Sequence, residues 1–250
     1  MGTEQGYQPR VLTGAEQLKA EGFARLRGKR VGLLTNPTGV TADLVSLVDQ
    51  LATAAGVELA ALFGPEHGLT AGAQAGDEIG EARHPRFGIP IHSLYGERHA
   101  PTEASLAGLD LLLIDIQDLG VRFYTYAATV ALTLEVCGRT GTPVLLLDRP
   151  NPIGGELIEG PIVEPAQRSF VGHLPIPIRH GLTLGELMRL ANDREGYGAA
   201  LEVLPVHGWR RGMWHDATGL PWVIPSPNLP TFACAVVYPG TCLFEGTALS

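Results

Sequence analysis

The feature that most constrains the fold is the run LDLLLIDI at residues 109–116, which is apolar at all but two positions. A run this short cannot cross a bilayer, since a membrane helix takes about 18 apolar residues. Nearly continuous apolar runs are typical of strands buried on both faces, and such strands occur in parallel sheets that helices cover on each side. We therefore predict a central, buried strand at Leu109–Ile116.

Other short apolar runs alternate with stretches of helical spacing, as a parallel sheet with crossover helices requires. The further predicted strands are Arg30–Thr35, Glu58–Phe63, Ile89–Tyr95, Pro143–Leu147 and Leu201–Val206. Pro90 places its strand near a sheet edge, because proline cannot donate a ladder hydrogen bond. The predicted helices are Ala42–Ala55, Phe123–Arg139 and Thr183–Arg194. This alternation predicts an α/β fold, a Rossmann-like wound parallel sheet.

The composition of the chain changes after Pro150, where proline and glycine become frequent. We predict a Rossmann-like catalytic core over residues 11–155. Residues 156–250 are expected to add the remaining sheet and helix elements and the start of a smaller, incomplete C-terminal domain. Within that part, residues 208–250 are predicted to be rich in loops. Thr183 and Glu186 have the spacing of a capping box at the start of the last predicted helix.

Composition excludes several classes of protein. The formal net charge is −8, and an acidic surface repels phosphate backbones, so we expect no nucleic-acid partner. The three cysteines form no CxxC pair, which argues against a disulfide scaffold or a structural zinc site. The N-terminal residues lack a signal-peptide pattern, so we expect a cytoplasmic protein on this chain, and a periplasmic or secreted one if an export signal was removed. Composition leaves the oligomeric state open.

Polar residues follow almost every predicted strand. Ligands of wound α/β sheets bind beyond the carboxyl ends of the strands, so these residues are expected to share one rim. The candidates, in chain order, are Asn36, Glu66, His67, Tyr95, Asp118, Asp148, Arg149 and Asn151.

Glu66 is the foremost catalytic candidate, because the flanking glycine and proline hold the backbone in a tight turn that fixes its carboxyl group. Asp77 and Glu78 supply further carboxylates from the same glycine-rich loop. Glycoside hydrolysis needs two carboxyl groups, one as acid and one as base or nucleophile. The alternatives are that Glu66 merely caps a loop amide and that the other two belong to a solvated acidic loop.

The segment after the central strand holds Asp115 and Asp118, followed by Arg122, Tyr124 and Tyr126. We expect a structural ion pair between Asp118 and Arg122, with an orienting contact to a sugar as the alternative. The side chains of the two tyrosines would point to the same side of the backbone only if the segment were extended. A divalent metal site formed by Asp115 and Asp118 with Glu66 and His67 is a further alternative, although the spacing matches no known metal motif.

Three later residues are weaker candidates, each in a loop flanked by glycine or proline. They are Glu164, Asn228 and Glu245. No phosphate-binding glycine motif, Walker A motif or G-x-S-x-G elbow occurs, which argues against nucleotide cofactors and a serine nucleophile. We therefore expect no cofactor.

Taken together, several of these segments resemble the DUF1343 family, which includes the exo-β-N-acetylmuramidases known as NamZ. The likeness covers roughly residues 11–250 in consistent order. The matching runs are LLTNPTGV (33–40), FGPEHG (63–68), SLYG (93–96), DIQDLGVRFYTY (115–126), LDRPNPIGG (147–155), EGPIVEP (159–165), PSPNLP (225–230) and YPGTCLFEGT (238–247).

The resemblance implies a hydrolase that releases N-acetylmuramic acid from the non-reducing ends of peptidoglycan fragments. It also implies a Rossmann-like N-terminal domain, a smaller C-terminal domain and an active site between them. Glu66 is the glutamate of the PEHG motif and is the implied general acid. Asp77, Glu78 and Glu164 are the candidates for the second carboxylate.

N-acetylmuramic acid carries a lactyl carboxylate, for which Arg122 or Arg149 is the expected partner, with help from His67. Two alternatives stay open beside the glycosidase. One is a non-catalytic carbohydrate-binding protein, and the other is a metal-dependent hydrolase using Asp115 and Asp118.

Overall fold

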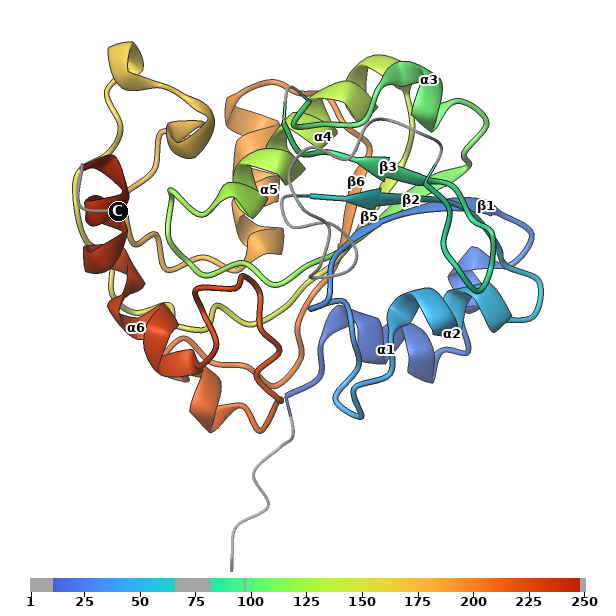
Figure 1. The fold of residues 1–250 in the computed structure, drawn as a ribbon, viewed down its shortest axis with the longest axis horizontal. Coiled ribbons are helices and arrows are strands. Elements are labelled where there is room, and N and C mark those ends of the chain that lie inside the picture. The colour runs from blue at the N-terminus through green and yellow to red at the C-terminus, as the bar shows by residue number, and fades with distance from the viewer. Residues whose placement is uncertain (1–10, 66–81, 97, 248–250) are drawn as a thin grey trace, which may run out of the picture.

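The computed structural model describes residues 11–65, 82–96 and 98–247. Its sheet has six strands, all parallel, in the order β3-β2-β1-β4-β5-β6 (Figure 1). The strands are β1 (Arg30–Thr35), β2 (Glu58–Gly64), β3 (Ile91–Ser93), β4 (Leu111–Asp115), β5 (Val144–Leu147) and β6 (Leu201–Leu204). This order is that of a Rossmann-like wound sheet, so the predicted fold class is confirmed.

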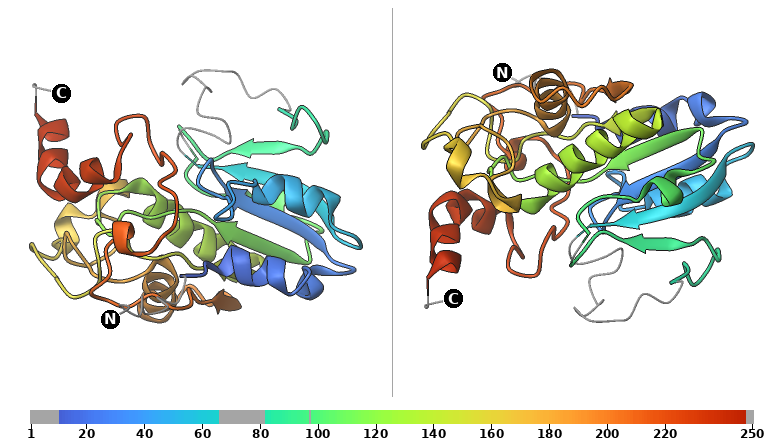
Figure 2. Two further views of the ribbon diagram at one scale, coloured as in Figure 1. Left: turned by 90° about the horizontal axis from the view of Figure 1, so that it is seen from below. Right: turned by 90° about the horizontal axis from the view of Figure 1, so that it is seen from above.

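Helices cover both faces of the sheet (Figures 1 and 2). They are α1 (Gly14–Ala20), α2 (Leu47–Thr53), α3 (Glu103–Leu106), α4 (Thr125–Thr140), α5 (Leu184–Arg194) and α6 (Phe232–Thr241). On one face α1 and α2 pack against Leu111 and Leu113 of β4. On the other face α4 and α5 pack against Leu112 and Ile114 of the same strand. Because every residue of β4 is buried, the prediction of a central two-sided strand is confirmed.

The direction of winding reverses between β1 and β4. From β1 the chain continues outward to β2 and β3, and then crosses back to place β4 on the other side of β1. The last residues of the two strands, Thr35 and Asp115, are paired in the register. Loops that leave the two strands therefore diverge at this point, which is where such sheets bind ligands.

Several element boundaries differ from the sequence prediction. The helix predicted at Ala42–Ala55 begins only at Leu47, after its N-cap Ser46. Before it, the Thr41 hydroxyl donates to the Asp43 carboxylate at 2.6 Å and Leu44 has a left-handed backbone with φ of 61°. A helix cannot begin through a left-handed residue, so Leu44, which lies within the predicted helix, stands before the observed one and is exposed.

The prediction that residues 208–250 are rich in loops is wrong in part, because α6 lies within this region. This helix contains Pro239 and lies beyond the carboxyl ends of the strands, outside the two helical layers (Figure 2). By contrast, the predicted capping box is confirmed. The Thr183 hydroxyl accepts from the Glu186 amide at 3.2 Å, and the Glu186 carboxylate accepts from the Thr183 amide at 3.0 Å.

Candidate active site

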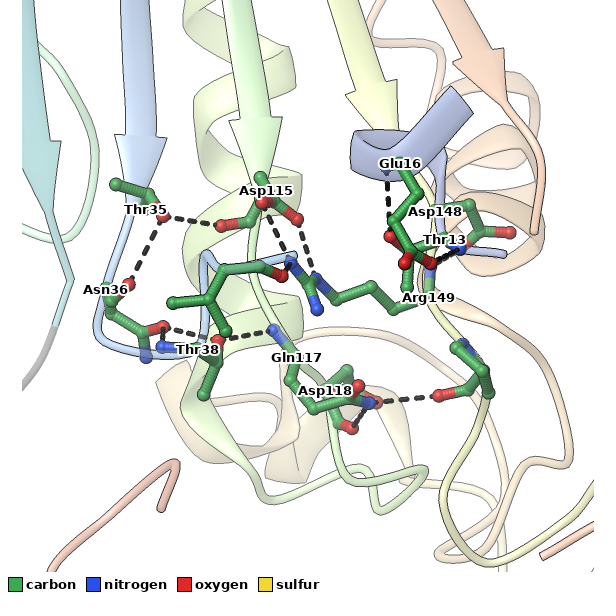
Figure 3. Close-up of polar contacts among 12 residues, drawn as sticks. Thr13, Glu16, Thr35, Asn36, Thr38, Asp115, Gln117, Asp118, Asp148 and Arg149 are labelled. Carbon is green, nitrogen blue, oxygen red and sulfur yellow. Dashed lines mark hydrogen bonds and ion pairs between the residues drawn. The ribbon is translucent and has the colours of Figure 1, made fainter. Parts of the chain in front are cut away.

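The loops that leave β1 and β4 are bound to each other by side chains (Figure 3). The Thr35 hydroxyl donates to the backbone oxygen of Asp115 at 2.8 Å. The Asn36 side-chain oxygen accepts from both the amide and the hydroxyl of Thr38, at 3.0 and 2.5 Å. The Thr38 hydroxyl oxygen in turn accepts from the backbone amide of Gln117 at 2.9 Å. Asn36 therefore lies at the predicted rim, where it shapes the loop after β1.

Arg149, at the end of β5, forms a buried bidentate ion pair with Asp115. Its Nε and Nη2 donate to the two carboxylate oxygens at 2.6 and 2.9 Å (Figure 3), and Nη2 also donates to the Val40 carbonyl. Two parallel bonds fix the plane of the guanidinium group. Both oxygens of Asp115 are therefore engaged by Arg149, while Nη1 of Arg149 donates no hydrogen bond to any described residue.

The predicted ion pair between Asp118 and Arg122 is wrong. Asp118 accepts from the Gly120 amide at 2.7 Å, and its other close group is Nε2 of the buried His180, at 3.7 Å. Arg122 instead donates through Nη1 to the carbonyls of Pro161 and Ile176, both at 2.6 Å. Desolvation lowers the pKa of Arg122 from its usual value.

His180 was missed by the sequence analysis. Its Nδ1 accepts from the Leu182 amide at 3.2 Å, which places the proton of the neutral imidazole on Nε2, facing Asp118. No sequence signal linked the two residues, because they lie on loops far apart in the chain.

Tyr124 and Tyr126 belong to the core rather than to an open surface. Their rings meet edge to face with centroids 4.6 Å apart, and Tyr124 also contacts Tyr238 of α6. The Tyr126 hydroxyl donates to the Pro225 carbonyl at 2.6 Å. Burial, followed by the neighbouring Tyr126, raises the pKa of Tyr124 well above its usual value. The pair therefore joins α4 to α6.

Asp148 and Asn151 hold the loop after β5. Asp148 is 3% exposed, and its carboxylate accepts from the Thr183 hydroxyl at 2.7 Å and from the Gly185 amide at 2.8 Å. Burial raises the pKa of Asp148 to about 6. Asn151 accepts from the Ile153 amide and donates to the Leu182 carbonyl.

A narrow crevice of about 20 Å³ opens at the switch point, with room for little more than a water molecule. Its walls include Thr38, Gln117, Arg149, His215 and Trp222. His215 is buried, burial lowers its pKa, and its ring stands edge-on to Trp222 with centroids 5.0 Å apart. His215 and Trp222 were both missed, since nothing in their sequence neighbourhood links them to the strand ends.

The remaining candidates do not line this crevice or lie outside the residues that the structure describes. Tyr95 is exposed after β3, and Glu164 is exposed at the start of a 3₁₀ turn at Pro165–Gln167. Asn228 and Glu245 are exposed in later segments. Four predicted site residues lie outside the described residues: Glu66, His67, Asp77 and Glu78.

The strand order and the polar crevice at its switch point define the class, an α/β protein of the Rossmann-like type with a candidate ligand site at the carboxyl edge. None of the helices in the described ranges is both long enough and apolar enough to span a bilayer.

The chain belongs to the NamZ family: residues 31–233 match the family described as exo-beta-N-acetylmuramidase NamZ, N-terminal. It is 49% identical over 243 residues to the peptidoglycan beta-N-acetylmuramidase NamZ of Bacillus subtilis (strain 168). That similarity covers 97% of this chain, which spans 59% of the length of the Bacillus protein.

Two crystal structures of DUF1343 family proteins from Bacteroides fragilis NCTC 9343 have the same fold. The first is 41% identical with a TM-score of 0.89 and covers 94% of this chain and 60% of its own. The second is 37% identical with a TM-score of 0.80 and covers 95% of this chain and 62% of its own. The predicted resemblance to the DUF1343 family is therefore confirmed.

Proposed function

We propose that the protein is an exo-β-N-acetylmuramidase, a glycoside hydrolase that releases N-acetylmuramic acid from the non-reducing ends of peptidoglycan fragments. The observation that carries this proposal is the 49% identity with the Bacillus peptidoglycan beta-N-acetylmuramidase across 97% of the chain. A polar crevice at the switch point of the sheet supports it, because ligands of wound sheets bind there.

Glu66 is the proposed general acid, which protonates the oxygen of the leaving sugar. A glutamate in this role must carry a proton when substrate binds, a state that a partly apolar, water-poor cleft favours. The second carboxylate comes from the set Asp77, Glu78 and Glu164. Of these, Glu164 is exposed, which makes it the weakest of the three for holding a water or attacking an anomeric carbon.

Arg149 is the better of the two proposed partners for the lactyl carboxylate. Its guanidinium group lines the crevice and is held in place by Asp115, so its Nη1 is preoriented. Arg122 instead uses Nη1 on two backbone carbonyls, and desolvation lowers its pKa. A ligand that bound Arg122 would have to displace those contacts or bind through another atom.

A metal-dependent reaction at Asp115 and Asp118 has little support from the contacts. Arg149 occupies both oxygens of Asp115, and a metal ion would have to replace that cation. The alternative that the experiment must distinguish is a carbohydrate-binding protein without catalytic activity.

The test is release of the aryl alcohol from an aryl β-N-acetylmuramic acid glycoside, with the matching N-acetylglucosamine glycoside as specificity control. We expect turnover of the muramic substrate alone. Glu66→Gln should abolish turnover while ligand binding persists. Glu58→Gln, at an exposed position at the start of β2, is the matched control. Binding without turnover, both in this chain and with the C-terminal part found in its relatives added, would favour the binding-protein alternative.

A further inference from the structure

A second hollow, of about 300 Å³, lies beside the crevice at the same edge of the sheet. We call it the arginine groove, and its walls include Asp148, Glu186, Arg189, Trp209, Arg210 and Arg211. Asp148 lines the groove and the next residue, Arg149, lines the crevice, so both hollows reach the loop after β5. A volume near 300 Å³ is at the lower end for small-ligand pockets.

The groove is rich in cations within a protein of net charge −8. Arg211 donates to the Glu186 carboxylate at 2.5 Å and to the Gly181 carbonyl at 2.9 Å. Arg189 makes one long contact, to the Val203 carbonyl at 3.4 Å. In the part of the chain that the structure describes, neither Arg189 nor Arg210 has an acidic partner.

Neither of the two acids in the groove walls is available to neutralise those arginines. Glu186 is bound to Arg211 through one oxygen and to the Thr183 amide through the other. Asp148 is buried and accepts from the Thr183 hydroxyl and the Gly185 amide. The groove therefore presents two exposed, unpaired guanidinium groups to solvent.

Trp209 gives the groove a fixed aromatic wall. Its indole nitrogen donates to the Met213 carbonyl at 3.1 Å, and the Arg211 guanidinium lies 5.9 Å from its ring centroid. The ring is half-buried, so part of it faces the groove. An aromatic face beside guanidinium groups is complementary to a pyranose ring that carries a carboxylate, because the ring packs on the aromatic surface and the carboxylate pairs with arginine.

We infer that the arginine groove is a second saccharide subsite, which binds an acidic sugar on the leaving-group side of the glycan chain. This inference rests on the proposed function, since alternate sugars of a peptidoglycan strand carry a lactyl carboxylate. The terminal muramic unit then lies over the mouth of the crevice, with its lactyl carboxylate toward Arg149, and the groove holds the next acidic sugar. The subsite gives longer fragments an affinity advantage over a single sugar.

The test compares ligand binding by calorimetry in the Glu66→Gln form of the 250-residue chain, which is expected to bind without turnover. The probe is a peptide-free tetrasaccharide of alternating N-acetylmuramic acid and N-acetylglucosamine with N-acetylmuramic acid at its non-reducing end, and chitotetraose is its neutral counterpart. Arg189→Gln/Arg210→Gln should weaken binding of the acidic tetrasaccharide by about tenfold, the loss expected for charge-assisted hydrogen bonds. Chitotetraose should bind more weakly than the acidic probe and lose less.

Arg194→Gln, at the exposed end of α5, is the matched control and should leave affinity for the acidic probe unchanged. Equal melting temperatures of the variants will show that the fold is retained. Unchanged affinity in the double variant, or an equal loss for the neutral probe, overturns the inference. Failure of the unmodified chain and of its extended form to cleave the aryl muramic glycoside overturns the proposed function instead, so the two failures are distinguishable.

Discussion

Asp148→Asn isolates what one buried carboxyl group contributes to stability. Asp148 is 3% exposed, and its Oδ1 accepts from the backbone amides of Arg149 and Gly185 while its Oδ2 accepts from the Thr183 hydroxyl. Burial raises its pKa from 3.8 to about 6, and the nearby charge of Glu186 adds to this rise, while the three hydrogen bonds oppose it.

The direction of the pH dependence follows from that shift. The folded protein binds the Asp148 proton more tightly than the unfolded chain, so this group's stabilising contribution is complete below about pH 4 and is lost as the pH rises through about 6. A shift of roughly two pKa units corresponds to about 3 kcal/mol. Asparagine stays neutral throughout this range. Its oxygen can accept from both backbone amides, and its amide nitrogen can donate to the Thr183 hydroxyl oxygen.

We therefore expect the stability of Asp148→Asn relative to the unmodified chain to improve as the pH rises. The free energy of unfolding, measured by urea denaturation at pH 4.5, 5.5, 6.5 and 7.5, should change in favour of the variant by about 2 kcal/mol across the series. Asp193→Asn, at an exposed position on α5, controls for the loss of one carboxylate. A difference between variant and unmodified chain that is the same at every pH would refute the reasoning.

Three further predictions concern the same edge of the sheet and the loop before α2. Arg149→Met leaves the carboxylate of Asp115 buried without its cation, so we expect the free energy of unfolding in urea to fall by about 3–5 kcal/mol. A loss under about 1 kcal/mol would contradict a buried ion pair. Gly120→Ala should lower the melting temperature by at least about 5 °C, because its φ is 76° and the new methyl group would clash with the Asn151 side-chain oxygen. Leu44→Gly should instead stabilise the protein by about 1 kcal/mol, because Leu44 is 60% exposed with φ of 61°. An unchanged or lower midpoint of unfolding would show that the left-handed backbone carries no strain.

The sheet was predictable because its strands are defined by short-range patterns. Each predicted strand overlaps an observed one, and Ile91–Ser93 is an edge strand as the proline indicated. The helix starts were less predictable where a polar loop imitates a helical pattern. Leu44 and Leu47 have helical spacing, but the hydrogen bond from Thr41 to Asp43 and the N-cap at Ser46 begin the helix later.

The partners of the site residues were less predictable than their positions. The sequence placed Asp118 near Arg122 because they are close in the chain. In the fold, Arg122 reaches carbonyls of a distant loop, and Asp118 faces His180. Likewise His215 reaches the switch point from a segment that has no periodic pattern. Such contacts depend on how loops return to the edge of the sheet, which local sequence does not encode.

Polar residues at strand ends have two different uses that look alike in a sequence. Where strands end and loops diverge, backbone amides and carbonyls lose their ladder partners and need side chains to bind them. Asp148 and Asn151 serve that purpose, since their oxygens accept from backbone amides and the amide group of Asn151 donates to a carbonyl. Arg149 differs, because it lines the crevice and its Nη1 donates to none of the described residues. Unused hydrogen-bonding capacity on a rigidly held group is what a ligand can exploit, so Arg149 is a stronger candidate for substrate contact than either neighbour.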